Sequence, residues 1–142
     1  MPSFTSQIAN LHATGPVVQI KLAVGNAAEE ALKGSGACLP DPVAAVGMID
    51  TGATGSVVQQ GLLGSLGIKP VGIAYINTPS STNVACHEYL VRFILPNNVV
   101  SETTVIEAPL QGQHIQCLLG RDMLAHGVFV YIGYTNQFTV SF

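Results

Sequence analysis

Apolar residues along this chain recur mainly at the two-residue spacing of β-strands. Residues 17–24 alternate around the polar Gln19 and Lys21, which is typical of a strand with one buried face. Residues 43–49 form a continuous run of small and branched apolar side chains, the pattern of a central strand. Similar patterns predict further strands at residues 71–77, 84–95, 99–106, 114–119, 128–132 and 138–142. The chain is therefore expected to be mainly β.

Short helical patterns lie between these strands. Asn26 could cap a helix over residues 26–31, because asparagine accepts hydrogen bonds from the first turn. Val58, Leu62 and Leu66 recur at helical spacing and are followed by a glycine that favours a helix end. Residues 120–126 could form one or two further turns. We therefore expect one or two short helices beside the strands.

Turn-forming residues divide the remaining strands into hairpins. Residues 78–83 join two predicted strands, and residues 133–136 join the last two. The segment 109–113 separates two more. We find no repeat and no linker, and 142 residues suit one domain. We expect residues 17–142 to form that domain and residues 1–16 to be an N-terminal extension that could be flexible.

Composition limits the classes of function. The chain is 48% apolar and only 9% charged, so a folded core is expected and a partner could cover part of the surface. The net charge of −3 and the lack of basic runs argue against nucleic-acid binding. No apolar stretch is long enough to span a membrane, and we identify no signal peptide, so we expect a cytoplasmic protein. The three cysteines indicate free thiols, although one bridge remains open.

The candidate chemistry begins where the central strand ends. Residues 43–49 deliver Asp50 into the turn Asp50-Thr51-Gly52-Ala53. A carboxylate at the end of a buried strand must be solvated, and the N–H groups of Gly52 and Ala53 could do this because glycine permits a tight turn. A simpler interpretation is that Asp50 only caps the following turn.

A second motif favours catalysis. Leu118-Leu119-Gly120-Arg121-Asp122 follows about one domain-half later, and together with Asp50-Thr51-Gly52-Ala53 it resembles the retropepsin-like, retroviral-type single-domain aspartic proteases. The resemblance covers roughly residues 17–142. It implies a closed acid-protease barrel, mainly β, with a flap hairpin whose tip is Thr78-Pro79-Ser80-Ser81.

The resemblance also implies roles for individual residues. Asp50 would be the catalytic acid, supported by its turn neighbours Thr51, Gly52 and Ala53, with Thr51 bonding across a dimer axis. Residues 118–120 would pack behind the turn, and Arg121 would pair with a nearby carboxylate. In many viral members that carboxylate stands where this chain has Thr54. We therefore expect another partner for Arg121, such as Asp41 or Asp122.

A single Asp-Thr-Gly motif implies two chains. Peptide hydrolysis without a covalent intermediate needs a base for water and an acid for the carbonyl oxygen. Two adjacent carboxylates that share one proton supply both. Since the chain carries one such motif, a homodimer is the economical arrangement. We expect proteolysis of a peptide or protein substrate, a hydrolase reaction that requires no cofactor or metal.

Other chemistries are less well supported. The four histidines show no metal-ligand spacing, and Cys86 and His87 are adjacent in a strand and so face opposite ways. Residues 52–56 lack the ending of a phosphate-binding loop, and Ser56 has no nucleophile motif. The alternative that stays open is a non-catalytic peptide-binding or dimerisation module with the same fold.

Overall fold

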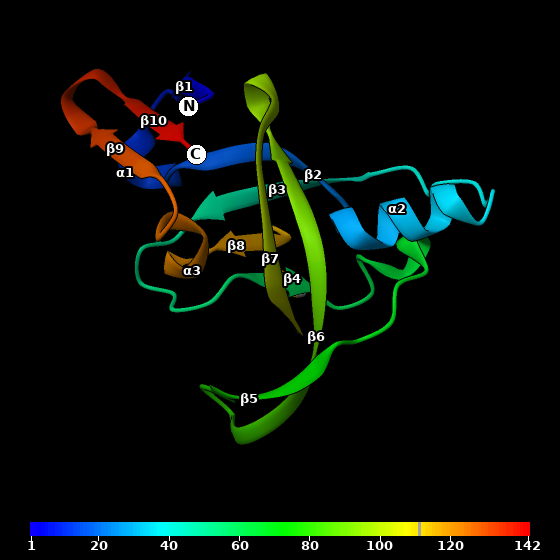
Figure 1. Cartoon of the computed structure of the whole chain (residues 1–142). Coiled ribbons are helices and arrows are strands. Elements are labelled where there is room, and N and C mark those ends of the chain that lie inside the picture. Colours follow the sequence, from blue (N-terminus) through cyan, green and yellow to red (C-terminus); the bar gives the residue numbers. More distant parts are fainter. Residues whose placement is uncertain (111) are drawn as a thin grey trace.

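The computed structural model describes residues 1–110 and 112–142, and six of its strands close a barrel. The order around the barrel is β2-β3-β8-β4-β7-β6, and pairing of β6 with β2 completes the ring. The pairs β3–β8 and β4–β7 are parallel, and the others are antiparallel. The closed, mainly β fold expected from the sequence is confirmed (Figure 1). The barrel strands are β2 (Val17–Val24), β3 (Val43–Ile49), β4 (Val57–Gln59), β6 (Ser81–Leu95), β7 (Val99–Ala108) and β8 (Cys117–Leu119).

The barrel is filled by branched and aromatic side chains. Alternate residues of each strand point inward, which explains the two-residue spacing in the sequence. Fully buried members come from five of the six strands and include Leu22, Val58, Val91, Phe93, Val99, Val105, Cys117 and Leu119. Gly47 of β3 lies against Leu119, and a Cβ there would come within 2.6 Å of the Leu119 Cδ1 atom. The apolar run in β3 is thus packed closely against β8.

A long hairpin leaves the barrel at one end. Strand β5 (Gly72–Thr78) pairs only with β6 among the described strands and forms the sheet edge. Thr78 pairs with Ser81, so the turn is tighter than the predicted loop 78–83. Asn83 adopts a positive φ of 53° inside β6, where the register shifts. Figure 1 shows this hairpin extending away from the barrel.

Residues 1–16, set apart as an extension in the sequence analysis, take part in a second sheet. Strand β1 (Ser3–Gln7) pairs with β10 (Gln137–Ser141), which pairs with β9 (Val128–Ile132). This small sheet brings the two chain termini together (Figure 1). Phe4 is buried, and Leu11 of helix α1 (Leu11–Thr14) is fully buried. The N-terminal residues therefore belong to the packed structure.

The helices partly match the expectation. Helix α2 (Asn26–Gly34) is longer than predicted, and Gly25 rather than Asn26 is its N-cap. Helix α3 (Arg121–Leu124) is a single turn, as expected after Gly120. Three further single turns are 3₁₀ helices, η1 (Gly64–Leu66), η2 (Pro96–Asn98) and η3 (Gly133–Thr135).

The helix predicted from Val58, Leu62 and Leu66 is wrong. Val58 belongs to β4, which pairs with β7 and β8, and only residues 64–66 are helical. Gly61 has a positive φ of 83°, which stops any helix that would cross it. Tertiary strand pairing therefore overrode a weak helical pattern.

The connection before β8 also differs from the prediction. The expected strand 114–119 is shorter, since β8 begins at Cys117. Residue 111, within the predicted turn 109–113, lies outside the described residues. Gln116 extends the contact, because its side-chain Oε1 accepts a hydrogen bond from the Val46 N–H at 2.8 Å. A side chain thus continues the pairing with β3 where the strand stops.

Replacing Phe138 tests the packing of the small sheet. Its ring contacts Phe4 and Phe129 with centroid separations of 6.2 Å each, and it is fully buried. Phe138→Ala should lower the free energy of unfolding by about 3–5 kcal/mol, because it leaves a cavity among these rings. Chemical denaturation measures this. Tyr134→Ala is the control, since Tyr134 is 92% exposed; equal loss in both variants would contradict the packing.

Candidate active site

The first part of the site is the turn that follows β3. Asp50 is partly buried, and its backbone N–H donates to the Leu119 carbonyl at 2.9 Å. Its Oδ1 atom accepts a hydrogen bond from the Gly52 N–H at 2.9 Å, as predicted. The Ala53 N–H donates instead to the Asp50 backbone carbonyl at 3.2 Å, so it closes the turn and does not bind the carboxylate. Thr51 and Gly52 are exposed.

The second motif packs directly behind this turn. Strand β8 runs parallel to the end of β3, with Ile49 opposite Leu119, so the two chain segments leave the barrel together. A Cβ on Gly120 would come within 2.7 Å of the Gly55 carbonyl carbon and oxygen. Only glycine permits this approach. The Arg121 N–H then donates to the Ala53 carbonyl at 2.9 Å, which joins the two backbones.

Arg121 has partners other than those expected. Its Nη1 donates to the Thr51 carbonyl at 2.7 Å, and its Nη2 donates to the Thr54 hydroxyl at 3.1 Å. The expectation that Asp41 or Asp122 would pair with it is wrong, because the ion pairs found among the described residues do not include Arg121. Thr54 thus accepts from Arg121 at the position where many viral members carry a carboxylate. The Arg121 guanidinium thus spans the turn after Asp50 and bonds to it at both Thr51 and Thr54.

Asp122 binds the far side of the same turn. Its carboxylate accepts hydrogen bonds from the Ser56 N–H at 2.9 Å and the Ser56 hydroxyl at 2.8 Å. It also accepts from the Met123 N–H at 2.8 Å and, more weakly, from the Thr103 hydroxyl at 3.5 Å. Hydrogen bonds to a carboxylate are roughly twice as strong as neutral ones. Asp122 of α3 therefore links the helix by hydrogen bonds to β7 and to Ser56, which follows the Asp50 turn.

Ser56 is the site residue that sequence reasoning missed. It is the buried polar residue of the core, and its hydroxyl both donates to Asp122 and accepts from the Gly120 N–H at 3.0 Å. The available signal was a small polar residue between a glycine turn and an apolar strand. The sequence alone presents Ser56 only as a serine without a nucleophile motif.

The structure brings together only part of the predicted site. Asp50 bonds to Leu119, and Thr51 and Ala53 bond to Arg121, whereas Gly52 bonds to Asp50. The flap-tip residues Thr78, Pro79, Ser80 and Ser81 lie elsewhere, and Thr78 bonds within its own turn. Figure 1 shows the hairpin end apart from the turn after β3. In one chain, the Asp50 turn is therefore uncovered.

Among the described residues, the cysteine thiols and the possible metal ligands show no second reactive site. Burial raises the pKa of the Cys117 thiol to about 12, so this group stays protonated near neutral pH. Cys86 is buried, Cys38 is exposed, and all three thiols are free. Residues 1–110 and 112–142 contain no group of three histidine, cysteine or acidic side chains placed to hold a metal ion. They also contain no helix that is both long enough and apolar enough to cross a membrane.

Replacing Ser56 tests the network behind the turn. Ser56→Ala removes one donor to Asp122 and leaves the Gly120 N–H without its acceptor, so the free energy of unfolding should fall by about 1–3 kcal/mol. Ser65→Ala is the control, because Ser65 is exposed in η1 and should change stability by less than about 0.5 kcal/mol. A Ser56 variant as stable as this control would refute the network's contribution.

Comparisons with known proteins give structural matches only. No family model and no curated protein matches the chain. A retropepsin-like aspartic protease from Rickettsia conorii is 14% identical over 99% of this chain and 94% of that chain, with a TM-score of 0.49. A foamy viral protease–reverse transcriptase, solved with an RNA/DNA hybrid, is 18% identical over 78% of this chain but 12% of that chain, with a TM-score of 0.48. The chain folds as a closed, mainly β barrel in which the two motifs pack together, and it is similar in structure to these two proteins.

Proposed function

We propose that the chain is an aspartic endopeptidase that is active as a homodimer. The observation that carries this proposal is the presentation of Asp50. The turn fixes its Oδ1 through the Gly52 N–H, whereas no hydrogen bond to Oδ2 is found among the described residues. One oxygen is thus positioned and the other is left for a proton or a water molecule. A residue that only capped the turn would not need the backing supplied by residues 118–122.

The proposed reaction uses two copies of Asp50 that share one proton. The ionised carboxylate takes a proton from water, and the resulting hydroxide attacks the peptide carbonyl carbon. The protonated carboxyl group gives its proton to the carbonyl oxygen, which forms a tetrahedral diol. The C–N bond then breaks as the amide nitrogen gains a proton from the dyad and the diol returns one to it. The pair ends with one shared proton, as it began.

The small sheet offers a surface for the second copy. Its inward side carries Phe4, Phe138 and Val140, so the alternate residues face outward. All of these outward residues are uncharged: Ser3, Thr5, Gln7, Val128, Val130, Ile132, Gln137, Thr139 and Ser141. The chain runs from β1 through α1 to Pro16, whose carbonyl accepts a hydrogen bond from the Ile49 N–H at the end of β3, at 3.1 Å. Association through this face would therefore bring two Asp50 turns toward one axis.

Asp50→Asn should abolish peptide hydrolysis. One substitution removes both carboxylates of the dyad, so turnover should fall on the order of 10⁴-fold or more. Cleavage of an unfolded protein by the purified variant is the measurement. Asp41→Asn is the matched control, because Asp41 is exposed and lies before β3. Retained turnover in Asp50→Asn would end the protease proposal.

The same experiment separates the alternative function. A non-catalytic peptide-binding or dimerisation module would show no cleavage in the wild type, while keeping its dimer and any peptide binding. In that case Asp50→Asn and Asp41→Asn would behave alike. The intact Asp-Thr-Gly turn favours the enzyme, because a binding module has no need of that carboxylate.

Activity should fall faster than linearly when the protein is diluted. A site made from two chains exists only in the dimer, whose population depends on protomer concentration. Val130→Asp should shift this fall to higher concentration, because each dimer would bury two new charges. Val130 is 42% exposed and Val100 is 37% exposed, so Val100→Asp on β7 is the control. Sedimentation that shows a fully active monomer would refute the dimer.

A further inference from the structure

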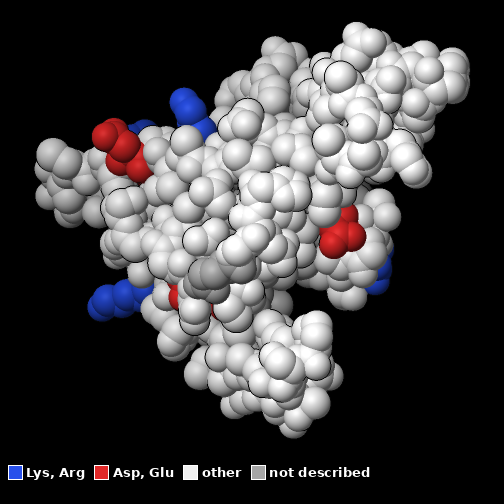
Figure 2. All heavy atoms as spheres, turned by 180° about the vertical axis from the view of Figure 1, so that it is seen from behind, with Lys and Arg blue, Asp and Glu red and all other residues white. Residues whose placement is uncertain are grey.

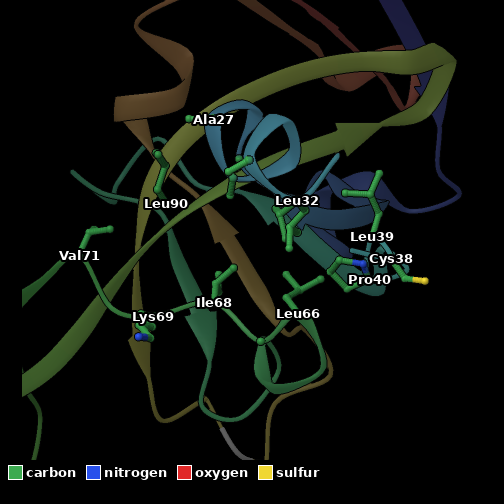
Figure 3. A pocket seen from close by; sticks show the side chains of 15 residues that line it. Ala27, Leu32, Cys38, Leu39, Pro40, Leu66, Ile68, Lys69, Val71 and Leu90 are labelled. Carbon is green, nitrogen blue, oxygen red and sulfur yellow. The ribbon is translucent and has the colours of Figure 1, made fainter. Parts of the chain in front are cut away.

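An apolar pocket lies at the other end of the barrel from Asp50. It has a volume of about 820 Å³ and is walled by α2, residues 38–40, residues 66–71 and Leu90 of β6 (Figure 3). Strand β3 begins beside this pocket and ends at Asp50, so the two places lie roughly 20 Å apart along the strand. The volume falls within the range of small-molecule sites. The pocket is therefore separate from the proposed catalytic centre.

The lining is almost entirely apolar and open to solvent. Helix α2 buries none of its residues, and the face that it turns to the pocket carries Ala27, Ala28, Ala31 and Leu32. Leu39, Val71 and Leu90 are 38%, 60% and 37% exposed. Such a concave apolar surface is unfavourable in water unless something occupies it. Figure 3 shows the side chains of Leu32, Leu66 and Ile68 around the same hollow.

Polar contacts keep α2 from collapsing into the pocket. Its first N–H, on Asn26, donates to Glu102 Oε2 at 2.6 Å. Arg92 Nη1 donates to Asn26 Oδ1 at 2.9 Å and to Glu29 Oε2 at 2.7 Å. Hydrogen bonds from Lys33 and then Arg92 hold the pKa of the Glu29 carboxyl below its usual range. The helix is thus anchored to β6 and β7, and its apolar side remains open.

We propose that this pocket binds an amphipathic carboxylate with a long apolar tail, of the fatty-acid class. The apolar walls suit the tail. Lys69 is the one charged residue of the lining, and it does not take part in the ion pairs found among the described residues. Lys69 is exposed to solvent, and an exposed lysine in the lining of an apolar pocket suits an anionic head group that stays in contact with water.

Fluorescence titration with cis-parinaric acid and its methyl ester tests the proposal. One molecule of the acid should bind per chain. Ala28→Trp fills the pocket and should weaken the binding of both probes about tenfold or more. A tenfold loss of affinity corresponds to about 1.4 kcal/mol, which the loss of a few apolar contacts supplies. Lys69→Gln should weaken binding of the acid about threefold, as expected for an exposed ion pair, and leave the ester unchanged. Glu30→Trp on the same helix and Lys21→Gln on β2 are the matched controls, and neither residue lines the pocket.

Three results would overturn the proposal. The first is binding of the acid that Ala28→Trp and Glu30→Trp change equally, since the probe would then not occupy the pocket. The second is equal loss of acid and ester binding in Lys69→Gln, or no loss of either. The third is dissociation of the dimer by Ala28→Trp in sedimentation, because a second copy would then cover the pocket. None of these readouts depends on hydrolysis, so the first two results would leave the proposed protease function untouched, whereas the third would also contradict dimerisation through the small sheet.

Discussion

The close approach of Gly120 to Gly55 is the constraint on which the candidate site depends. Two backbones meet there with no room for a side chain. This proximity lets the Arg121 N–H reach the Ala53 carbonyl and the Ser56 hydroxyl reach the Gly120 N–H. The turn after β3 is therefore held by hydrogen bonds from a segment about seventy positions later in the chain. The orientation of the Asp50 carboxylate is thus set by the fold, through the Gly52 N–H on the same turn.

The sequence predicted most strands, because alternation and buried runs report directly on barrel packing. The family resemblance also implied that residues 118–120 pack behind the Asp50 turn, and the two segments do lie side by side. Local sequence patterns failed where long-range pairing decides the outcome. Val58 lies in a strand because β7 and β8 flank it, and residues 3–7 form a strand because β10 pairs with them. Neither partner can be recognised from local spacing.

Two side chains at the site show the same limit on a smaller scale. The sequence predicts a carboxylate partner for Arg121, yet Arg121 donates to the Thr51 carbonyl and the Thr54 hydroxyl. Asp122 was expected near Arg121, yet it turns to Ser56. The sequence shows which residue types are present, but it does not show which hydrogen-bond partners two neighbouring side chains reach. A helical turn points Arg121 and Asp122 in different directions, and that geometry assigns their partners.

The low charge content follows from where charges are used. Arg92 and Glu102 anchor α2 through Glu29 and Asn26, and Arg121 and Asp122 hold the Asp50 turn and Ser56. Elsewhere large areas of the surface carry few charges, as the face in Figure 2 shows. Charged side chains therefore hold α2 and the Asp50 turn, while the outward face of the small sheet is uncharged and the pocket lining carries one charged residue, Lys69. Uncharged surface suits both the proposed self-association and the apolar tail of the proposed ligand, since neither contact would have to strip water from an ionised group.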